Sequence, residues 1–407
     1  MSGIPTVKLR DCTTKIGSGT TPRGGHTAYK QSGIPLIRSM NVRMNGFSRD
    51  GLAFIDEEQD SSMSGTRVQP ADVLLNITGA SIGRVCIAPD EICPANVNQH
   101  VCIIRSNGRL EPEWIAFFIS QPDFQSQILG QQAGATRQAL TKEMIEQFEL
   151  PAPDLPTQRR LATRLKSQMA TVEETRRRVE EQFKHCETLR LKFSAEAFAP
   201  EVLFQWEERP LLEMSKIVSG VTLGGPTAKE PTRKVPYLRV ANVKDGWLML
   251  DDVKEIDATE REIGQFSLKH GDVVLTEGGD PDKLGRGTVW REEIGLCLHQ
   301  NHIFRVRFDQ DQVCPEFAAY QFASKYGKAY FLAHAKQTTG IASINKGVLS
   351  RFPFRLPPLK TQRQIAARLR EQFTHLRQLQ NALRTQLEAL DKLPGAFLRE
   401  AFGSLAG

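Results

Sequence analysis

The chain has 407 residues, of which 40% are hydrophobic and 25% are charged, and its formal net charge is +6 at neutral pH. This composition excludes a disordered or fibrous protein, and the length allows two domains of about 150 residues with connecting elements. The positive charge is compatible with a polyanion such as DNA but does not identify one.

The sequence contains no apolar run of the roughly 18 residues that a membrane helix needs, and its start, MSGIPTVKLRDC, lacks the apolar segment of a signal peptide. We therefore expect a cytoplasmic protein. The seven cysteines include no C-x-x-C pair, so we expect buried free thiols rather than a disulfide framework or a zinc site. The sequence predicts no metal site.

The first segment, about residues 1–150, alternates short apolar runs with turn-forming residues. The runs 34–37, 73–75 and 101–104 are predicted strands, and a helical stretch is predicted near residues 112–130. The glycines at 17, 19, 24 and 25, like those at 220, 224 and 225, match no dinucleotide fingerprint, so we expect them to serve turns or close approach to a DNA backbone. This segment is predicted to be a β-rich α+β domain.

A long amphipathic helix is predicted next, from about residue 157 to 193, within the segment 151–204. Its apolar residues recur every seven positions, which is typical of a coiled coil: Leu165, Val172, Val179, Cys186 and Phe193. Prolines before the helix make Thr157 a candidate N-cap. At about 1.5 Å per residue the helix would be roughly 55 Å long, too long to lie inside a small domain.

The segment 205–355 resembles the first one. Its predicted strands are 235–240, 273–275 and 302–306, and its predicted helical stretch lies near 315–332. IPLIRSMNV, starting at Ile34, corresponds to VPYLRVANV, starting at Val235, whereas the loops between such framework pieces differ almost completely. Two similar scaffolds with unlike loops indicate the same task performed on different targets.

The last segment, 356–407, repeats the long helix at an offset of 204 positions, because TQRRLATRL from Thr157 corresponds to TQRQIAARL from Thr361. Thr361 is a candidate N-cap with a capping box from Gln364, and Pro394-Gly395 is expected to break the helix. The heptad positions keep the same register: Leu369, Leu376, Leu383, Leu390 and Phe397.

The two heptad seams can bury each other in a coiled coil, and antiparallel pairing follows if the globular parts lie at opposite ends. Intermediate apolar residues are expected on the other side of the seam, namely Phe183, Leu189, Phe373, Leu379, Leu387 and Leu393. Parallel pairing and two separate amphipathic helices are the alternatives.

These residues resemble the specificity subunit of type I restriction-modification enzymes over essentially the whole chain. The resemblance rests on the paired segments LPAPDLPTQRRLATRL and FRLPPLKTQRQIAARL, the paired strands named above and the ending LPGAFLREAFGSLAG. It also rests on two Asp-hydrophobic-hydrophobic elements, starting at Asp72 and Asp272, each followed by a Gly-Arg pair, at residues 83–84 and 285–286. It implies an α+β fold in which two β-rich target-recognition domains are joined by two long helices forming an antiparallel coiled coil.

The resemblance also implies a function. Each domain would read one half of a bipartite double-stranded DNA target, and the helices would set the unread spacer and dock two modification subunits, with restriction subunits as further partners. The chain itself would be no enzyme and hold no cofactor. S-adenosylmethionine, ATP and Mg would belong to the partner subunits.

Consistent with this implication, the sequence contains no G-x-x-x-x-G-K-[ST], H-E-x-x-H or Asn-Pro-Pro-aromatic motif. Asp280, Asp282 and Lys283 suggest a nuclease site, but the other domain has the small uncharged residues 78–81 in that place. Two competing hypotheses are a stand-alone DNA-binding regulator and an enzyme with an undetected site at the two aspartates.

Base-reading residues are expected in the divergent loops, because Arg, Lys, Asn, Gln, Ser and Thr match the hydrogen-bonding edges of bases in the major groove. The alternative for each is a solvated loop side chain. The candidates are Thr20, Thr21, Arg23, Arg43, Asn76, Thr78, Arg137, Thr222, Lys229, Lys244, Thr276, Glu277 and Lys283.

Arginines that recur in both domains suit contacts with phosphates, which carry no sequence information, with a structural ion pair as the alternative. These are Arg38, Arg84, Arg239 and Arg286. Other arginines stand at the helix starts, where a positive charge does not complement the helix dipole, so we expect them to serve something outside the helix. They are Arg159, Arg160, Arg164, Arg363 and Arg368.

Overall fold

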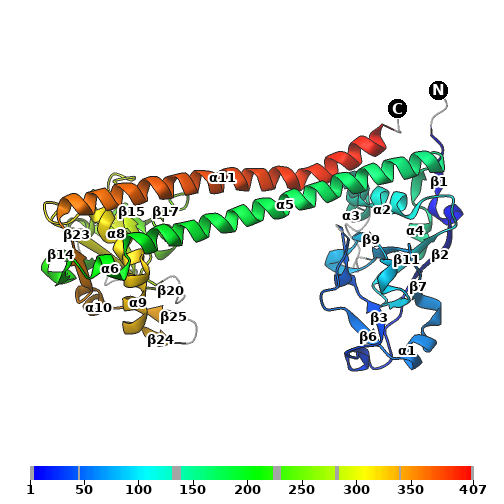
Figure 1. Ribbon diagram of the computed structural model, residues 1–407, viewed down its shortest axis with the longest axis horizontal. Coiled ribbons are helices and arrows are strands. Elements are labelled where there is room, and N and C mark those ends of the chain that lie inside the picture. The colour runs from blue at the N-terminus through cyan, green and yellow to red at the C-terminus, as the bar shows by residue number, and fades with distance from the viewer. Residues whose placement is uncertain are drawn as a thin grey trace. The chain divides into compact units, whose positions relative to one another are not determined.

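The computed structural model describes residues 4–44, 46–130, 139–222, 231–279, 284–338 and 341–404, which fall into two compact units. The first unit contains residues up to 180 together with those from 384 onward, and the second contains residues 181–383. Each unit holds one globular domain and part of each long helix, α5 (Leu155–Ala197) and α11 (Leu359–Gly403) (Figure 1).

The first domain is built on two four-stranded sheets. One is antiparallel, in the order β2 (Thr13–Ser18), β11 (Val101–Ser106), β8 (Val73–Asn76), β9 (Val85–Ile87). The other is mixed, in the order β6 (Ala53–Ile55), β3 (Ile34–Ile37), β10 (Ala95–Val97), β7 (Arg67–Val68), with β3 and β10 parallel. Two further antiparallel pairs are β1 (Thr6–Lys8) with β12 (Glu149–Pro151) and β4 (Val42–Arg43) with β5 (Gly46–Phe47).

The helices of the first domain are α1 (Glu57–Ser62), α2 (Pro112–Ser120), α3 (Pro122–Gly130) and α4 (Lys142–Glu146). Helices α2 and α3 lie between α5 and the strands (Figure 1). Trp114 and Ile115 of α2 share one buried cluster with Leu161 and Leu165 of α5. The long helix is therefore part of the domain core at this end.

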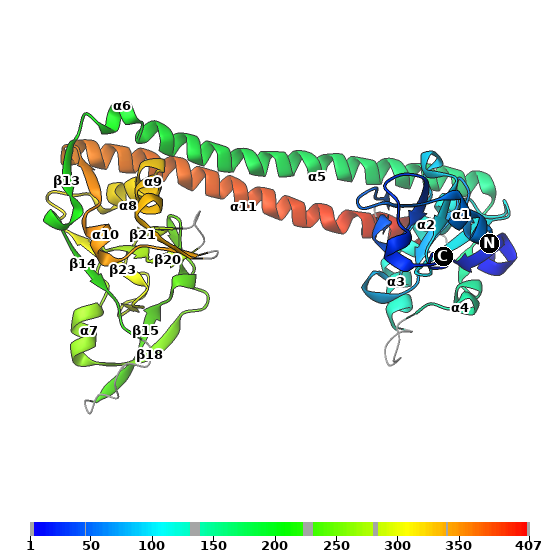
Figure 2. The ribbon, with the colours of Figure 1, turned by 90° about the horizontal axis from the view of Figure 1, so that it is seen from below.

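The second domain repeats this scaffold. Its antiparallel sheet has the order β14 (Ser215–Ser219), β23 (Ile303–Phe308), β19 (Val273–Thr276), β21 (Gly287–Val289). Its mixed sheet has the order β18 (Lys254–Thr259), β15 (Thr232–Leu238), β22 (Leu298–His299), with β15 and β22 parallel. Figure 2 shows β15 and β18 side by side. The remaining pairs are β13 (Glu207–Pro210) with β26 (Pro353–Leu356) and β16 (Val243–Lys244) with β17 (Trp247–Leu248).

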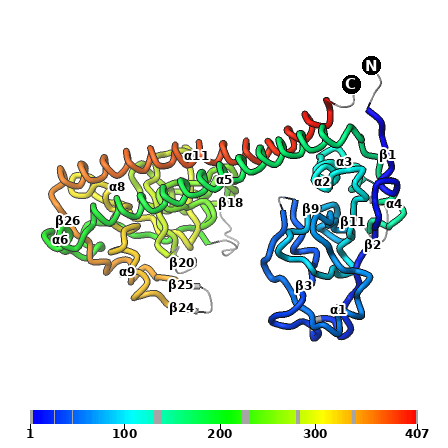
Figure 3. Tube along the Cα trace, turned by 45° about the vertical axis from the view of Figure 1, so that its right-hand side comes forward, coloured from blue at the N-terminus to red at the C-terminus, as the bar shows by residue number. Residues whose placement is uncertain are grey.

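One sheet of the second domain goes beyond this shared set: β20 (Gly278–Gly279), β25 (Ile341–Ser343) and β24 (Lys336–Thr338) lie on the side of the domain away from α11 (Figure 3). The helices are α6 (Pro200–Leu203), α7 (Glu260–Phe266), α8 (Pro315–Ala323), α9 (Lys325–His334) and α10 (Lys346–Ser350). The predicted strands in both domains are confirmed, except that β15 ends before residues 239 and 240 and β23 begins one residue after 302. Each predicted helical stretch is two helices, because Pro122 in one domain and the N-cap Ser324 in the other start a new helix.

The duplication extends to a buried ion pair. The carboxylate of Asp72 accepts two hydrogen bonds of 2.7 Å from Arg105, and that of Asp272 accepts two of 2.6 Å from Arg307. Both carboxylates are 1% exposed, so loss of either arginine would leave a buried unpaired charge. The Asp at the start of the repeated Asp-hydrophobic-hydrophobic element is thus a structural residue in both domains.

Two equivalent glycines serve a close approach of the protein's own backbone. A Cβ atom added to Gly19 would lie 1.7 Å from the carbonyl oxygen of Val97, and one added to Gly220 would lie 1.8 Å from that of His299. Any larger residue would force these segments apart. The close approach at Gly19 and Gly220 is therefore made by the protein's own backbone rather than by the expected DNA backbone.

The heptad residues form a buried seam. Leu165, Val172, Val179, Cys186, Leu369, Leu376, Leu383 and Leu390 are all buried, and Phe193 and Phe397 are half-buried. Leu379 and Leu393 are 46% and 37% exposed, so the expected second side of the seam is wrong at these two positions. The other four intermediate residues, Phe183, Leu189, Phe373 and Leu387, are half-buried.

Within each unit the two helix segments run antiparallel. In the first unit Arg164 pairs with Glu400 at 2.5 Å, and Arg176 further along α5 pairs with Asp391 further back along α11. In the second unit Arg368 pairs with Glu196 at 3.8 Å. Arg164 and Arg368 are 204 positions apart, as are Glu196 and Glu400, so the repeat encodes the same interhelical ion pair once in each unit.

Two expectations about the helix ends are wrong. The helices begin at Leu155 and Leu359, so Thr157 and Thr361 lie inside the first turn, and Gln364 has no N-cap there with which to form a capping box. The Oδ1 of Asp154 accepts from the N–H of Thr157 at 2.9 Å and fills the capping role in α5.

The predicted break at Pro394 is also wrong, because α11 continues to Gly403. Beyond the proline, Leu398 and Phe402 are 4% and 5% exposed, and the Phe402 ring lies 4.4 Å from that of Trp114. Burying two such side chains stabilises by about 1.5–3 kcal/mol each, which offsets the cost of about 3 kcal/mol for an internal proline. Tertiary packing therefore keeps the helix intact.

The repeated Thr-Gln-Arg sequence is explained by its glutamines, which are 1% and 0% exposed. The Oε1 of Gln158 accepts from the N–H of Glu111, and its Nε2 donates to the carbonyl of Pro153, both at 2.8 Å. Gln362 makes the same two bonds, with Cys314 and Pro357, also at 2.8 Å. Each glutamine ties the start of a long helix to the start of a helix in the neighbouring domain.

Replacing Gln362 by alanine leaves a buried N–H and a buried carbonyl without partners. We expect the variant to lose about 1–3 kcal/mol for each orphaned group, seen as a lower urea midpoint of the second unit. The matched control is Gln378→Ala in the exposed middle of the same helix, which should change stability by less than about 0.5 kcal/mol. Equal urea midpoints for the two variants would show that the hydrogen bonds of Gln362 do not stabilise the second unit.

Candidate nucleic-acid interface

The loop residues predicted to read bases in the first domain are mostly accessible. Thr20, Thr21 and Arg23 are exposed in the loop after β2, and Thr78 is half-buried just after β8. Arg43, at the end of β4, is exposed and forms an ion pair with Asp50 at 3.1 Å. These residues have polar groups that a ligand can reach.

Four polar side chains of this domain are joined in a chain of hydrogen bonds, here called the Gln99 cluster: Thr21, Gln99, His100 and Thr78. The Oγ1 of Thr21 lies 2.5 Å from Oε1 of Gln99, whose Nε2 lies 3.0 Å from Nε2 of His100. The Nδ1 of His100 lies 2.6 Å from Oγ1 of Thr78. The cluster thus connects the loop after β2 with the loop after β8, and each of these loops holds a predicted base-reading residue.

Sequence reasoning missed Gln99 and His100. The signal was present, because Asn98-Gln99-His100 stands directly before β11 and Gln300-Asn301-His302 stands directly before the equivalent strand β23. A repeated triplet of amide and imidazole side chains before a framework strand is therefore a further candidate for the interface.

In the second domain the corresponding edge carries different groups. The Oε2 of Glu277 lies 2.7 Å from Nδ1 of His302, and the imidazole is 58% exposed. Thr222 is exposed in the loop after β14, and Lys244 is half-buried on β16. The candidates Arg137, Lys229 and Lys283, and also Asp280 and Asp282, lie outside the described residues.

Two predicted base readers are fully buried, Asn76 and Thr276. The Nδ2 of Asn76 donates to the carbonyl of Ser39 at 2.8 Å, which fixes the turn after β3. Both residues end a strand whose four side chains are all buried, so they present no polar group to a ligand in this conformation. Their burial favours a structural role.

The four recurring arginines differ in their surroundings. Arg38 donates to the carbonyl of Gly51, and its guanidinium lies 5.3 Å from the centre of the Tyr29 ring. Arg239 pairs with Asp252 at 2.8 Å, and hydrogen bonds from Lys254 and from Arg239 lower the pKa of this carboxyl. Both arginines thus hold the turn that follows an equivalent strand, and Arg239 does so through the ion pair expected as the structural alternative.

The other two recurring arginines suit phosphate contacts better. Arg84 is exposed and Arg286 is half-buried, and neither forms an ion pair with a described residue. Their guanidinium charges are therefore not neutralised by a carboxylate within the described part of the chain. The prediction of a phosphate contact stands for these two.

The arginines at the helix starts also divide. Arg159 pairs with Glu111 at 2.6 Å, and Arg164 and Arg368 form the repeated interhelical pairs with Glu400 and Glu196. Carboxylates of the same chain thus explain these three. Arg160 and Arg363 are exposed and form no ion pair with any residue that the structure describes.

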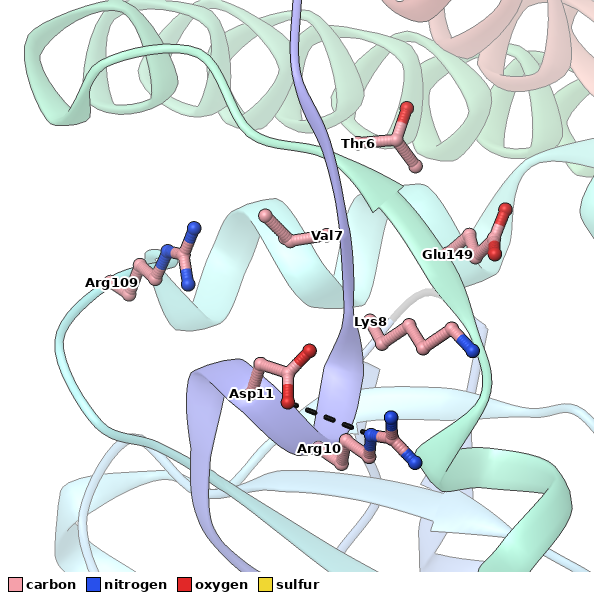
Figure 4. Close-up of a pocket in the computed structure, with 7 residues that line it drawn as sticks. All are labelled: Thr6, Val7, Lys8, Arg10, Asp11, Arg109 and Glu149. Carbon is pink, nitrogen blue, oxygen red and sulfur yellow. Dashed lines mark ion pairs between the residues drawn. The ribbon is translucent and has the colours of Figure 1, made fainter.

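A hollow in the first domain lies around β1 (Figure 4). Its charged side chains alternate in sign, with Lys8, Arg10 and Arg109 beside Asp11 and Glu149, and Arg10 pairs with Asp11 at 3.5 Å. The predicted base readers do not line it. Mixed charges do not favour a polyanion, so we do not assign DNA binding to this hollow.

A buried histidine distinguishes the two mixed sheets. His299 ends β22, is 0% exposed, and its Nδ1 lies 2.9 Å from the carbonyl oxygen of Ile303. Burial lowers the pKa of His299 to about 4, so its ring is neutral at pH 7. The Nε2 atom has no hydrogen-bond partner among the described residues. The equivalent position of the first domain is Val97, which needs no such partner.

The described helices include none that is both long enough and apolar enough to cross a membrane. All seven cysteines are free thiols, and all but the half-buried Cys93 are buried, as expected. Burial raises the pKa of Cys86, Cys102 and Cys297 to about 12, which makes these thiols unreactive near neutral pH.

The family model described as the type I restriction modification DNA specificity domain matches residues 1–181 and again 205–389. The chain is 22% identical to the type I restriction enzyme StySPI specificity subunit of Salmonella potsdam, over 98% of this chain and 88% of the relative. It is 21% identical to the EcoKI specificity subunit of Escherichia coli K12, over 92% and 82% of the two chains.

Solved structures have the same fold. The HsdS subunit from Thermoanaerobacter tengcongensis matches with a TM-score of 0.62 at 19% identity, covering 99% of this chain and 97% of that one. A chain from a structural study of complex assembly and conformational transition of the type I R-M system matches with a TM-score of 0.73 at 19% identity, covering 99% and 98%. The duplicated α+β domains and long helices are shared with these proteins.

The buried His299 predicts a pH dependence specific to the second unit. Because its folded pKa lies below the ordinary value near 6.5, the unfolded chain binds a proton first as the pH falls, and stability is lost between about pH 6.5 and 4. The loss approaches about 3 kcal/mol at the acid end. Replacing His299 by valine, the residue of the first domain, should flatten this part of the profile in urea unfolding measurements.

The control for this experiment is His302→Ala, which removes an exposed histidine from the same region. The His302→Ala variant should still lose stability between about pH 6.5 and 4, as the wild type does. A wild-type profile of the second unit that is flat between pH 6.5 and 4, or an unchanged slope in His299→Val, would show that the ring is not held neutral by burial.

Proposed function

Because this chain belongs to the family of type I restriction-modification DNA specificity proteins, we propose that it is the sequence-reading subunit of a type I restriction-modification complex. Each domain reads one half of a bipartite DNA target. The observation that carries this proposal is the contrast between the shared framework of the two domains and their unlike polar edges. Asp72 and Asp272 hold the same buried ion pair, whereas Gln99 and Thr78 at one edge correspond to Asn301 and Gly278 at the other.

This contrast fits a pair of DNA readers with different targets. A shared framework gives both domains the same approach to the duplex, and different hydrogen-bonding groups at the same strand ends select different bases. Arg84 and Arg286 recur at equivalent positions without carboxylate partners among the described residues, so they suit phosphates on either side of the bases read. The net charge of +6 is compatible with this role.

We assign the long helices two tasks in this function. Their seam keeps one heptad register in both copies, so the pair acts as a rod that sets the unread spacer between the half-sites. Their outer surface carries exposed Leu379 and Leu393, together with Arg160 and Arg363, which form no ion pair with a described residue. These side chains suit the docking of protein partners. The partners are two modification subunits, one for each copy of the repeat, and restriction subunits.

The chemistry of the complex is assigned to these partners. S-adenosylmethionine binds the modification subunits, and ATP and Mg the restriction subunits, so the chain works without a cofactor of its own. The relatives that it resembles are named specificity subunits, which supports this division. A cytoplasmic location follows from it, because the complex acts on cellular DNA.

Reconstitution tests the proposed function. The isolated chain should transfer no methyl group to DNA, whereas addition of modification subunits and labelled S-adenosylmethionine should give methylation confined to one split sequence. Methyl transfer by the isolated chain would contradict the division of tasks. Tight binding of a split site by the isolated chain that modification subunits neither join nor change would indicate a stand-alone regulator instead.

Lengthening the rod tests the spacer assignment. One heptad inserted after Glu180 in α5 and one after Leu383 in α11 keeps the seam in register and adds about 10 Å of helix. Methylome sequencing should then report unchanged half-sites with a spacer longer by about three base pairs, since B-DNA rises about 3.4 Å per base pair. The same heptad in α5 alone serves as a control that breaks the register. Altered half-sites with an unchanged spacer would refute the assignment.

A further inference from the structure

The Gln99 cluster holds both polar atoms of an exposed amide. Gln99 lies in the turn before β11, and its carboxamide is fixed on one side by Thr21 and on the other by His100, at 2.5 and 3.0 Å. The His100 ring is itself held by the Thr78 hydroxyl at 2.6 Å, and the backbone N–H of His100 donates to the Oδ1 of Asn98 at 3.1 Å. An exposed side chain fixed by neighbours loses little freedom on binding, which favours recognition.

The remaining hydrogen-bonding capacity of this amide can be counted. A glutamine amide has two donor hydrogens and two acceptor lone pairs. In the cluster, Thr21 bonds one polar atom of the amide and His100 bonds the other. If the oxygen accepts from Thr21, the nitrogen donates to His100, and one lone pair and one hydrogen remain. If the amide is turned over, the nitrogen donates to Thr21 and the oxygen accepts from His100, and the same pair remains. Either orientation presents one donor beside one acceptor.

We propose that Gln99 reads an adenine in the half-site bound by the first domain. Adenine presents an N6 donor beside an N7 acceptor in the major groove, and a glutamine amide pairs with both. Guanine presents two acceptors there, so it would leave the amide oxygen opposite an acceptor. This assignment rests on the proposed function and adds to it the base and the residue that reads it. Thr21 and His100 are positioning residues that fix the amide.

The second domain lacks this arrangement at the equivalent place. Its triplet is Gln300-Asn301-His302, and its histidine pairs with the carboxylate of Glu277 rather than with an amide. A carboxylate beside an imidazole has a different hydrogen-bonding pattern from the Gln99 amide. The adenine assignment therefore applies to one half-site only, which makes the experiment internally controlled.

Methylome sequencing of cells that carry the complete system with chain variants tests the proposal. In Gln99→Ala, one A·T pair in one half-site should become degenerate, with discrimination reduced about five- to a hundredfold, and the other half should be unchanged. Gln99→Glu keeps the shape but supplies only acceptors, so the preference at that pair should move from adenine towards cytosine. Asn301→Ala is the matched control from the second domain and should leave this pair unchanged.

The outcomes are distinguishable. A wild-type methylome without a split motif would overturn the proposed function and this assignment together. A split motif that is the same in wild type and Gln99→Ala would overturn the assignment alone, as would relaxation at a G·C pair or in both halves. Because Gln99 is exposed, its variants should keep the wild-type unfolding midpoint. Thr21→Val should weaken the same adenine preference less than Gln99→Ala does, and relaxation at a different pair would contradict its positioning role.

Discussion

The structure depends on an exchange of helix ends between the two repeats. The core of the first domain contains Leu161 and Leu165 from the start of α5 together with Leu398 and Phe402 from the end of α11. The core of the second contains Leu369 from the start of α11 together with Phe198, which follows α5 directly. Because each domain needs the start of one helix and the end of the other, antiparallel pairing is imposed by burial of apolar surface rather than by the seam alone.

This exchange separates two kinds of sequence constraint. Residues that hold a helix to a domain, such as Gln158 and Gln362, occur at the same position in both copies because both copies meet the same backbone groups. Residues at the strand ends face no such shared partner, and there Thr78 and Gly278 differ. Recognition can therefore diverge without disturbing the framework.

Much of this was predictable from the sequence, because duplication makes a framework visible without an alignment. The strands, the heptad seam and the two-domain architecture follow from apolar periodicity and from the repeat. The continuation of α11 through Pro394 did not follow, since it depends on contacts with Trp114, which lies 280 positions earlier. Composition made Asn76 resemble a base reader, but only the fold shows that its amide is buried. The repeated triplet before β11 marks Gln99 in the sequence, but its hydrogen bond with Thr21 joins residues 78 positions apart, which no local pattern connects.

The position of Leu398 and Phe402 also has a consequence for synthesis on the ribosome. A growing chain exposes the strands of the first domain early, yet two apolar side chains of that core emerge only after the whole second domain has been translated. Until then the surface of Trp114 that contacts Phe402 is left open to water. The first domain is thus the first to be synthesised and the last to complete its core. A chaperone or a partner subunit therefore has the longest time to bind that incomplete core.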